Sequence, residues 1–228
     1  MKIKFSLLTL CAFFPAFLAL GQDKPLDNAL SPDRLTIFQA PLQCPAAPQI
    51  GCGSRAKPML LELERNPSVS EAWLNRAGTQ ITLVWKAQSK ASDRQSLAAQ
   101  LKEHGATELK GKDRTQAIND FQSGKGWYRG ADVDRLSEEE ARIIAARLVH
   151  RVEAKTTLSK DKAEGLELAL SDAIKKRSTD GQVKQSQDAM FKSEGGLQQA
   201  VGQYLDKDQV PILKQAIEAG WRPLPDEK

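Results

Sequence analysis

The order of hydrophobic patterns over residues 34–110 is the feature that most constrains how this chain can fold. Ile81, Leu83 and Trp85 alternate with polar or smaller residues, which is the period of a strand. Leucines, alanines and a methionine elsewhere recur at helical spacing. In chain order, the patterns predict a strand at 35–38, a helix at 54–65, strands at 69–74 and 79–85, a helix at 92–105 and a strand at 106–109.

This β-α-β-β-α-β order is that of the split βαβ, or ferredoxin-like, plan. After it, four glycines punctuate a polar segment at 111–135, which predicts a linker that docks on a domain. The predicted fold class is therefore α+β. We expect a ferredoxin-like domain at 34–110, the linker, and then a small antiparallel helical domain at 136–220.

The chain from Ser137 onward has helical periodicity. Ser137 and Glu140 have the spacing of a capping box, and Asp206 with Gln209 begins a later helix in the same way. The apolar stripes predict helices at 137–152, 159–179, 183–204 and 206–219. Short antiparallel helices of this kind pack most simply as a bundle.

The N-terminus predicts the compartment. Lys2 and Lys4 precede an apolar stretch, and Ala19-Leu20-Gly21 offers small residues before a cleavage, so residues 1–21 are interpreted as a secretory signal peptide. The apolar stretch is short for a membrane-spanning helix, and no other run is long enough to span. We therefore expect an exported chain, in the bacterial periplasm, without a membrane span in its mature form.

Removal of the signal peptide lowers the formal net charge from +4 to +2, because the peptide carries two lysines and no acid. A charge so near balance argues against a nucleic-acid surface. No glycine-rich phosphate loop, nucleophile elbow or His-Glu-x-x-His motif is present, so no enzyme is predicted. The expected partners are a metal ion or another envelope protein, and the broad helical stripes also allow a homodimer.

Cys44 and Cys52 are the two cysteines of the mature chain, and both lie in the loop between the first strand and the first helix. Paired thiolates suit soft or borderline ions such as Cu(I), Zn(II) or Hg(II). A helix N-terminus favours the thiolate of Cys52. In an oxidising compartment the even count favours pairing as a static disulfide, worth about 2–3 kcal/mol, and the thiols could also stay free. The sequence predicts a metal site at Cys44 and Cys52 and leaves these alternatives open.

The segment Gly51–Leu74 resembles the heavy-metal-associated (HMA) domain, in which a cysteine opens the first helix and a valine begins the second strand. Cys52 and Val69 occupy those places. The resemblance covers residues 34–110 and implies a ferredoxin-like fold with metal bound at the cysteines. The family separates its two cysteines by two residues, whereas seven separate Cys44 from Cys52. The glycine–aromatic pair that precedes the family's last strand is also missing.

The helical half resembles the Spy/CpxP-type periplasmic metal-resistor proteins, whose helices open with Leu-Thr-x-x-Gln. Residues 205–209 and, more loosely, 158–162 take those places. This resemblance implies an envelope chaperone or a metal-sensing bundle. The leading hypothesis is an exported protein that binds or senses a heavy metal. The alternative is a non-enzymatic chaperone-like or protein-binding module with a structural disulfide.

The remaining metal-ligating residue types have simpler interpretations. His104 lies at a predicted helix end and His150 on a charged helix face, so both are expected at the surface. The acidic run Glu138–Glu140 suits the start of a helix, where negative charge is favoured.

Overall fold

The computed structural model describes residues 30–179 and 201–227. The expected signal peptide and most of the helix predicted at 183–204 lie outside these ranges. The elements are η1 Pro32–Arg34, β1 Leu35–Gln39, α1 Gly53–Arg65, β2 Val69–Asn75, β3 Gln80–Trp85, α2 Ala91–Glu103, β4 Thr107–Glu108, α3 Gly111–Gln122, β5 Trp127–Arg129, η2 Gly130–Val133, α4 Asp134–Glu153, α5 Lys160–Thr179 and α8 Val210–Glu218, where η marks a short 3₁₀ helix.

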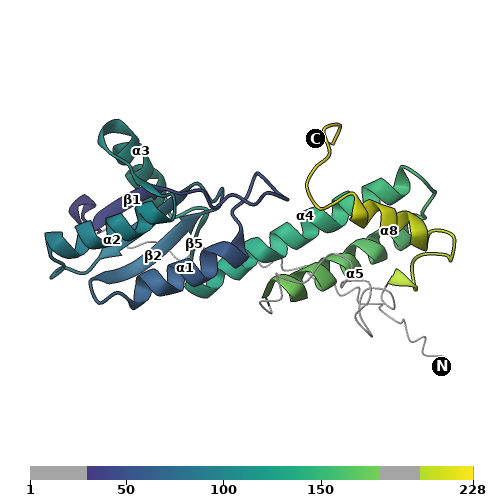
Figure 1. Cartoon of the computed structure of the whole chain (residues 1–228), viewed down its shortest axis with the longest axis horizontal. Helices are drawn as coiled ribbons and strands as arrows, with labels where there is room; N and C mark the ends of the chain where they lie inside the picture. Colours follow the sequence, from purple (N-terminus) through teal and green to yellow (C-terminus); the bar gives the residue numbers. More distant parts are fainter. Residues whose placement is uncertain (1–29, 180–200, 228) are drawn as a thin grey trace, which may run out of the picture.

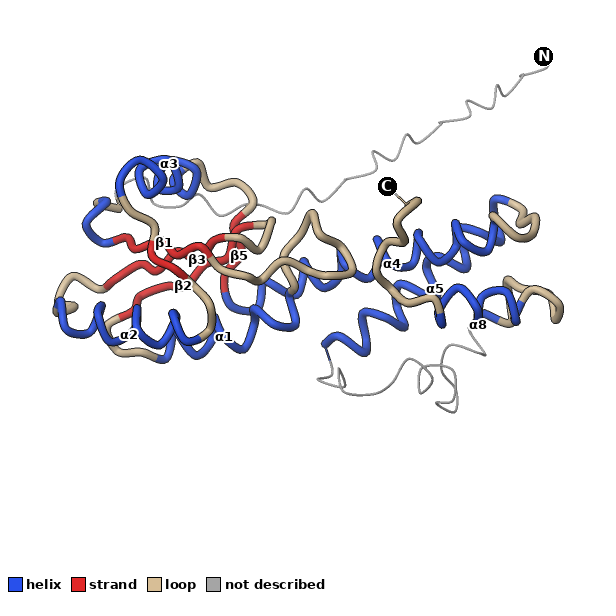
Figure 2. The backbone as a smooth tube through the Cα atoms, turned by 45° about the horizontal axis from the view of Figure 1, so that its top comes forward, coloured by secondary structure: helices blue, strands red, loops and turns tan. Residues whose placement is uncertain are grey.

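One five-stranded antiparallel sheet has the order β4-β1-β3-β2-β5 (Figures 1 and 2). The register places Leu35 opposite Val84 across the central pair β1 and β3. This combination of helices with one antiparallel sheet confirms the predicted α+β class.

Helices cover both faces of the sheet, because its central strands carry apolar residues on both sides. Ile81, Leu83 and Trp85 pack with α1 and α2 in one core. Val84 points the other way and packs with α3 in a second core. Trp85 is fully buried, and its indole N–H donates to Thr36 Oγ1 at 2.8 Å. The period-two pattern of β3 therefore positions residues on both faces of the sheet.

The segment 111–135, expected to be a linker, contains instead the helix α3, the strand β5 and the short helix η2. Phe121 of α3 is fully buried and meets Trp73 and Trp127 edge to face, with ring centroids 5.9 and 5.1 Å apart. β5 pairs with β2 and so extends the sheet. The prediction failed because the many polar residues of α3 hid its buried face, which Ala117 and Ile118 complete.

Three helices, α1, α2 and α4, begin earlier than predicted. α1 begins at Gly53 with Cys52 in the N-cap position. α4 begins at Asp134, so Ser137 lies inside the helix and is buried instead of capping it. The predicted capping box at Ser137 was therefore wrong.

The helices α4, α5 and α8 pack together in a third core, to which the loop between β1 and α1 also contributes. α4 begins beside α1 at the sheet and continues into this group, as Figure 1 shows. Lys57 of α1 and Asp134 of α4 form an ion pair at 2.6 Å near this crossing. Within the described residues, no helix has the length and apolar character needed to cross a membrane.

The crossing of α1 and α4 generates the first prediction. A Cβ atom at Gly53 would lie 2.4 Å from Ser137 Oγ and 2.7 Å from the Val133 carbonyl oxygen. We expect Gly53→Ala to lower the free energy of unfolding by about 1–3 kcal/mol, because the helices would have to move apart. Urea unfolding measures the effect. A variant as stable as the wild type would show that the two helices do not cross this closely.

Candidate functional site

The loop between β1 and α1 folds back on itself and returns close to its starting point. The Cys44 backbone N–H donates to the Ile50 carbonyl at 2.8 Å, and the Cys52 N–H donates to the Leu42 carbonyl at 2.7 Å. These bonds hold the two ends of the loop side by side. They explain how two cysteines with seven residues between them come to lie in one site, although the HMA family uses a shorter spacing.

The turn between β2 and β3 packs directly against this loop. Gly78 has a positive φ of 70°, and a Cβ atom there would lie 2.5 Å from Gly51 Cα. The Gly51 N–H donates to the Arg76 carbonyl of the same turn at 2.7 Å. Close backbone contact of this kind needs glycine on both sides. The contact fixes the position of the cysteine loop relative to the sheet.

Both cysteines are free thiols and both are buried, with 1% of Cys44 and 6% of Cys52 exposed. Ala47 and Ile50 of the same loop are fully buried in the core that α4, α5 and α8 share. The thiols therefore lie where the sheet-bearing half meets the helices, and not on a free loop at the surface.

Each thiol shifts the pKa of the other, and their environments differ. A hydrogen bond from Cys44 is the largest effect that lowers the pKa of Cys52, and the Ser54 hydroxyl and the Arg55 backbone N–H at the start of α1 also lower it. The Ser54 oxygen lies 3.4 Å from Cys52 Sγ. The same bond, burial and the nearby Glu140 raise the pKa of Cys44. Cys52 is therefore the more readily ionised thiol, and Cys44 is the one that keeps its proton.

Glu140 of α4 is the third member of the site. Its carboxyl hydrogen-bonds with Cys44, while burial and the charge of Cys52 raise its pKa to about 7. Its Oε2 atom is buried and has no hydrogen-bond partner among the described residues. A carboxyl group that is partly protonated near neutral pH thus lies beside the two thiols. We call Cys44, Cys52 and Glu140 the thiol site.

Sequence reasoning placed Glu140 in a capping box and an exposed acidic run, and so missed its position beside the cysteines. One signal was present. Glu140 precedes Ile144 by four residues and Leu148 by eight, so it lies on the apolar stripe of α4 that the core buries. An acid on such a stripe needs a partner in the core.

The histidines play no part in this site. His104 and His150 are both exposed, as expected from their places on the helices. Across residues 30–179 and 201–227, no group of three or more histidine, cysteine or acidic side chains is arranged to hold a metal ion. Any metal at the thiol site would therefore depend on the two sulfurs.

The raised pKa of Glu140 makes stability depend on pH. The folded state keeps the proton up to about pH 7, whereas the unfolded carboxyl loses it near its ordinary value of 4.5. The wild type should therefore lose roughly 3 kcal/mol of stability as pH rises from 4.5 through 7. Glu140→Gln should remove this loss. Urea unfolding of both proteins at pH 5 and pH 8 tests this prediction. An equal change in the free energy of unfolding between the two pH values in both proteins would contradict it.

Comparison with known proteins adds no relative from which a function could be transferred. Neither a protein-family model, nor a curated protein, nor a solved structure matches the chain.

Proposed function

We propose that this chain is an exported, non-enzymatic protein that binds one soft metal ion through Cys44 and Cys52. The observation that supports it most is that one closed loop carries two buried thiols to the start of α1, where the pKa of Cys52 is lowered to about 5. Two sulfurs held by the same loop could bind one ion together. Sensing of that ion, and not only its storage, remains part of the proposal.

The donor set favours ions that accept two ligands. A structural zinc site needs four ligands, and the described residues do not assemble even three. Thiolates select Cu(I) among the biological ions, and Hg(II) shares that preference for sulfur. Cu(I) or Hg(II) is therefore a better fit than Zn(II). Cys44 must give up its proton for both sulfurs to act as thiolates, so binding should release protons.

The fold supports the same proposal. β3 lies between β1 and β2, which is the arrangement that splits a βαβ unit. We propose that residues 34–110 form a ferredoxin-like domain of the heavy-metal-associated kind, extended at one edge by β5. The helices of residues 136–220 would form a separate helical domain. Export of the chain to the periplasm, after cleavage following Gly21, is part of the proposal.

Metal titration tests the proposed site. The reduced mature chain should bind one Cu(I) per molecule in competition with a chromophoric chelator, and native mass spectrometry should show the adduct. Cys44→Ser and Cys52→Ser should each weaken binding at least 100-fold, because one sulfur cannot complete the site. Ser92→Ala, at an exposed serine of α2, is the matched control, since it leaves the cysteine loop unchanged. Equal binding by the Cys44→Ser/Cys52→Ser double variant would refute the proposal.

A structural disulfide is the second candidate, and the lowered pKa of Cys52, to about 5, favours it. The thiolate is the reactive form of cysteine, and the periplasm supplies oxidants. Both cysteines are free thiols in the structure. The disulfide would tie a protein-binding module together. In that case, chain isolated from the periplasm should contain no free thiol on alkylation and mass analysis. Reduction should then lower its stability by about 2–3 kcal/mol, with no dependence on metal.

A further inference from the structure

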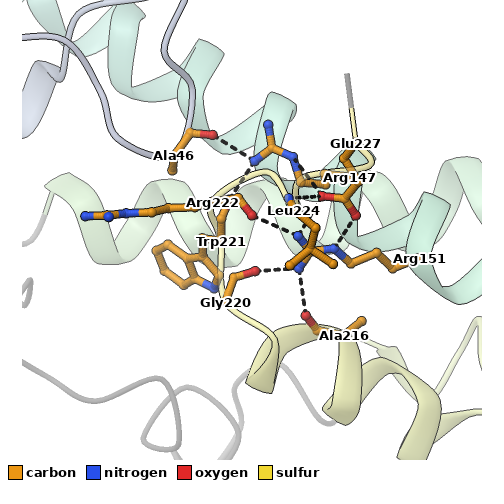
Figure 3. A network of polar contacts seen from close by, with 9 residues as sticks. All are labelled: Ala46, Arg147, Arg151, Ala216, Gly220, Trp221, Arg222, Leu224 and Glu227. Atoms are coloured by element: carbon orange, nitrogen blue, oxygen red, sulfur yellow. Dashed lines mark hydrogen bonds and ion pairs between the residues drawn. The ribbon is translucent and has the colours of Figure 1, made fainter.

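A groove lies along α4. Its walls come from α4, α8, Pro48 and Gln49 of the cysteine loop and the last described residues, and its volume is about 1260 Å³. Residues 220–227, which we call the strap, form one side of it without forming a helix or strand. Figure 3 shows two arginines of α4 that reach toward the strap.

Arg151 makes the main contact. Only 8% of its side chain is exposed, and it binds both carboxylate oxygens of Glu227, at 2.6 Å from Nε and 2.8 Å from Nη2. The same guanidinium donates to the carbonyls of Ala216 and Arg222 at 3.0 and 2.9 Å. This paired geometry holds a carboxylate in one orientation. Arg151 lowers the pKa of Glu227 to about 2, so the carboxylate stays charged.

Arg147 lies one turn earlier on α4 and is less fully neutralised. It donates to the Ala46 carbonyl at 2.7 Å and to the Trp221 carbonyl of the strap, while Glu227 lies 3.9 Å away. Burial lowers the pKa of Arg147. Glu227 therefore supplies a single negative charge near two largely buried guanidinium groups.

The charges that line the groove are divided between its two sides. Every acid among the lining residues belongs to the strap, namely Asp226 and Glu227. The basic residues, Arg147, His150, Arg151 and Lys155, belong to α4 or follow it directly. Apolar side chains such as Ile143 and Ile212 lie between them. Without the strap, the lining would be basic and partly apolar and would contain no acid.

We propose that the strap is an internal ligand and that this groove binds an extended acidic segment of a partner protein. The partner would place a glutamate or aspartate on Arg151 and backbone carbonyls near Arg147, as the strap does, with apolar residues ahead of the acid. Charge complementarity identifies this class of partner. Because the strap is tethered, it competes for Arg147 and Arg151 at high effective concentration until it is displaced.

The test uses the strap sequence itself as the probe. A fluorescein-labelled peptide with the sequence of residues 219–227 carries an amidated C-terminus, so that its only carboxylates are the two side chains. Fluorescence anisotropy measures its binding to the full mature chain. Glu227→Gln should bind the peptide at least 10-fold more tightly than the wild type, because the internal carboxylate is lost. Asp226→Asn is the matched control, and it should bind like the wild type.

A second labelled peptide has glutamine in place of the glutamate that corresponds to Glu227. The Glu227→Gln protein should bind this second peptide at least 10-fold more weakly than it binds the first. Hydrogen exchange should show faster exchange of the strap amides in Glu227→Gln, with the helices unchanged.

Three results would overturn the proposal. Equal peptide binding by the wild type and Glu227→Gln, with protected strap amides in both, would make the strap a permanent part of the helical core. Equal binding of the two peptides would exclude recognition of the carboxylate. A Glu227→Gln dimer on size-exclusion chromatography, with peptide binding lost, would identify a second copy of this chain as the occupant. None of these results depends on metal binding at the thiol site.

Discussion

The rest of the structure depends on the burial of one loop. Residues 42–52 leave the sheet, place Ala47 and Ile50 in the core of α4, α5 and α8, and return to begin α1. This packing removes apolar surface from water in both halves of the molecule and joins them without a long linker. α4 strengthens the joint, because it contacts α1 at one end and α5 and α8 further along. The sheet and the helices therefore share a buried boundary.

The thiol site exists because of that boundary. The loop supplies Cys44 and Cys52, and α4 supplies Glu140, so neither half contains the whole site. The start of α1 favours a thiolate at Cys52, while burial opposes charge on all three groups. The same boundary leads to the groove, because Arg147 holds both Ala46 of the cysteine loop and Trp221 of the strap. One side chain therefore contacts both the cysteine loop and the strap.

Much of the sheet could be predicted from the sequence, because its strands and helices have strong local patterns. β3 was recognisable from the alternation ending at Trp85, and α8 from its apolar stripe. The predicted capping box of Asp206 and Gln209 was wrong, because α8 begins at Val210 and the Gln209 side chain accepts from the Asp206 N–H in the turn before the helix. α3 and β5 could not be recognised, since their burial depends on contacts of Phe121 and Trp127 with a distant strand. Glu140 was missed for a similar reason, because its position depends on a loop almost ninety residues earlier.

The sequence by itself determined the α+β class, the central strands and the pair of cysteines before α1, because each follows from short-range periodicity or residue chemistry. The tertiary structure alone decided that Glu140 faces the thiols and that the strap meets Arg147 and Arg151. Local patterns specify which face of a helix is apolar, but they do not specify which distant segment covers it. That choice comes from packing, where loop 42–52 and the strap both bury groups against α4.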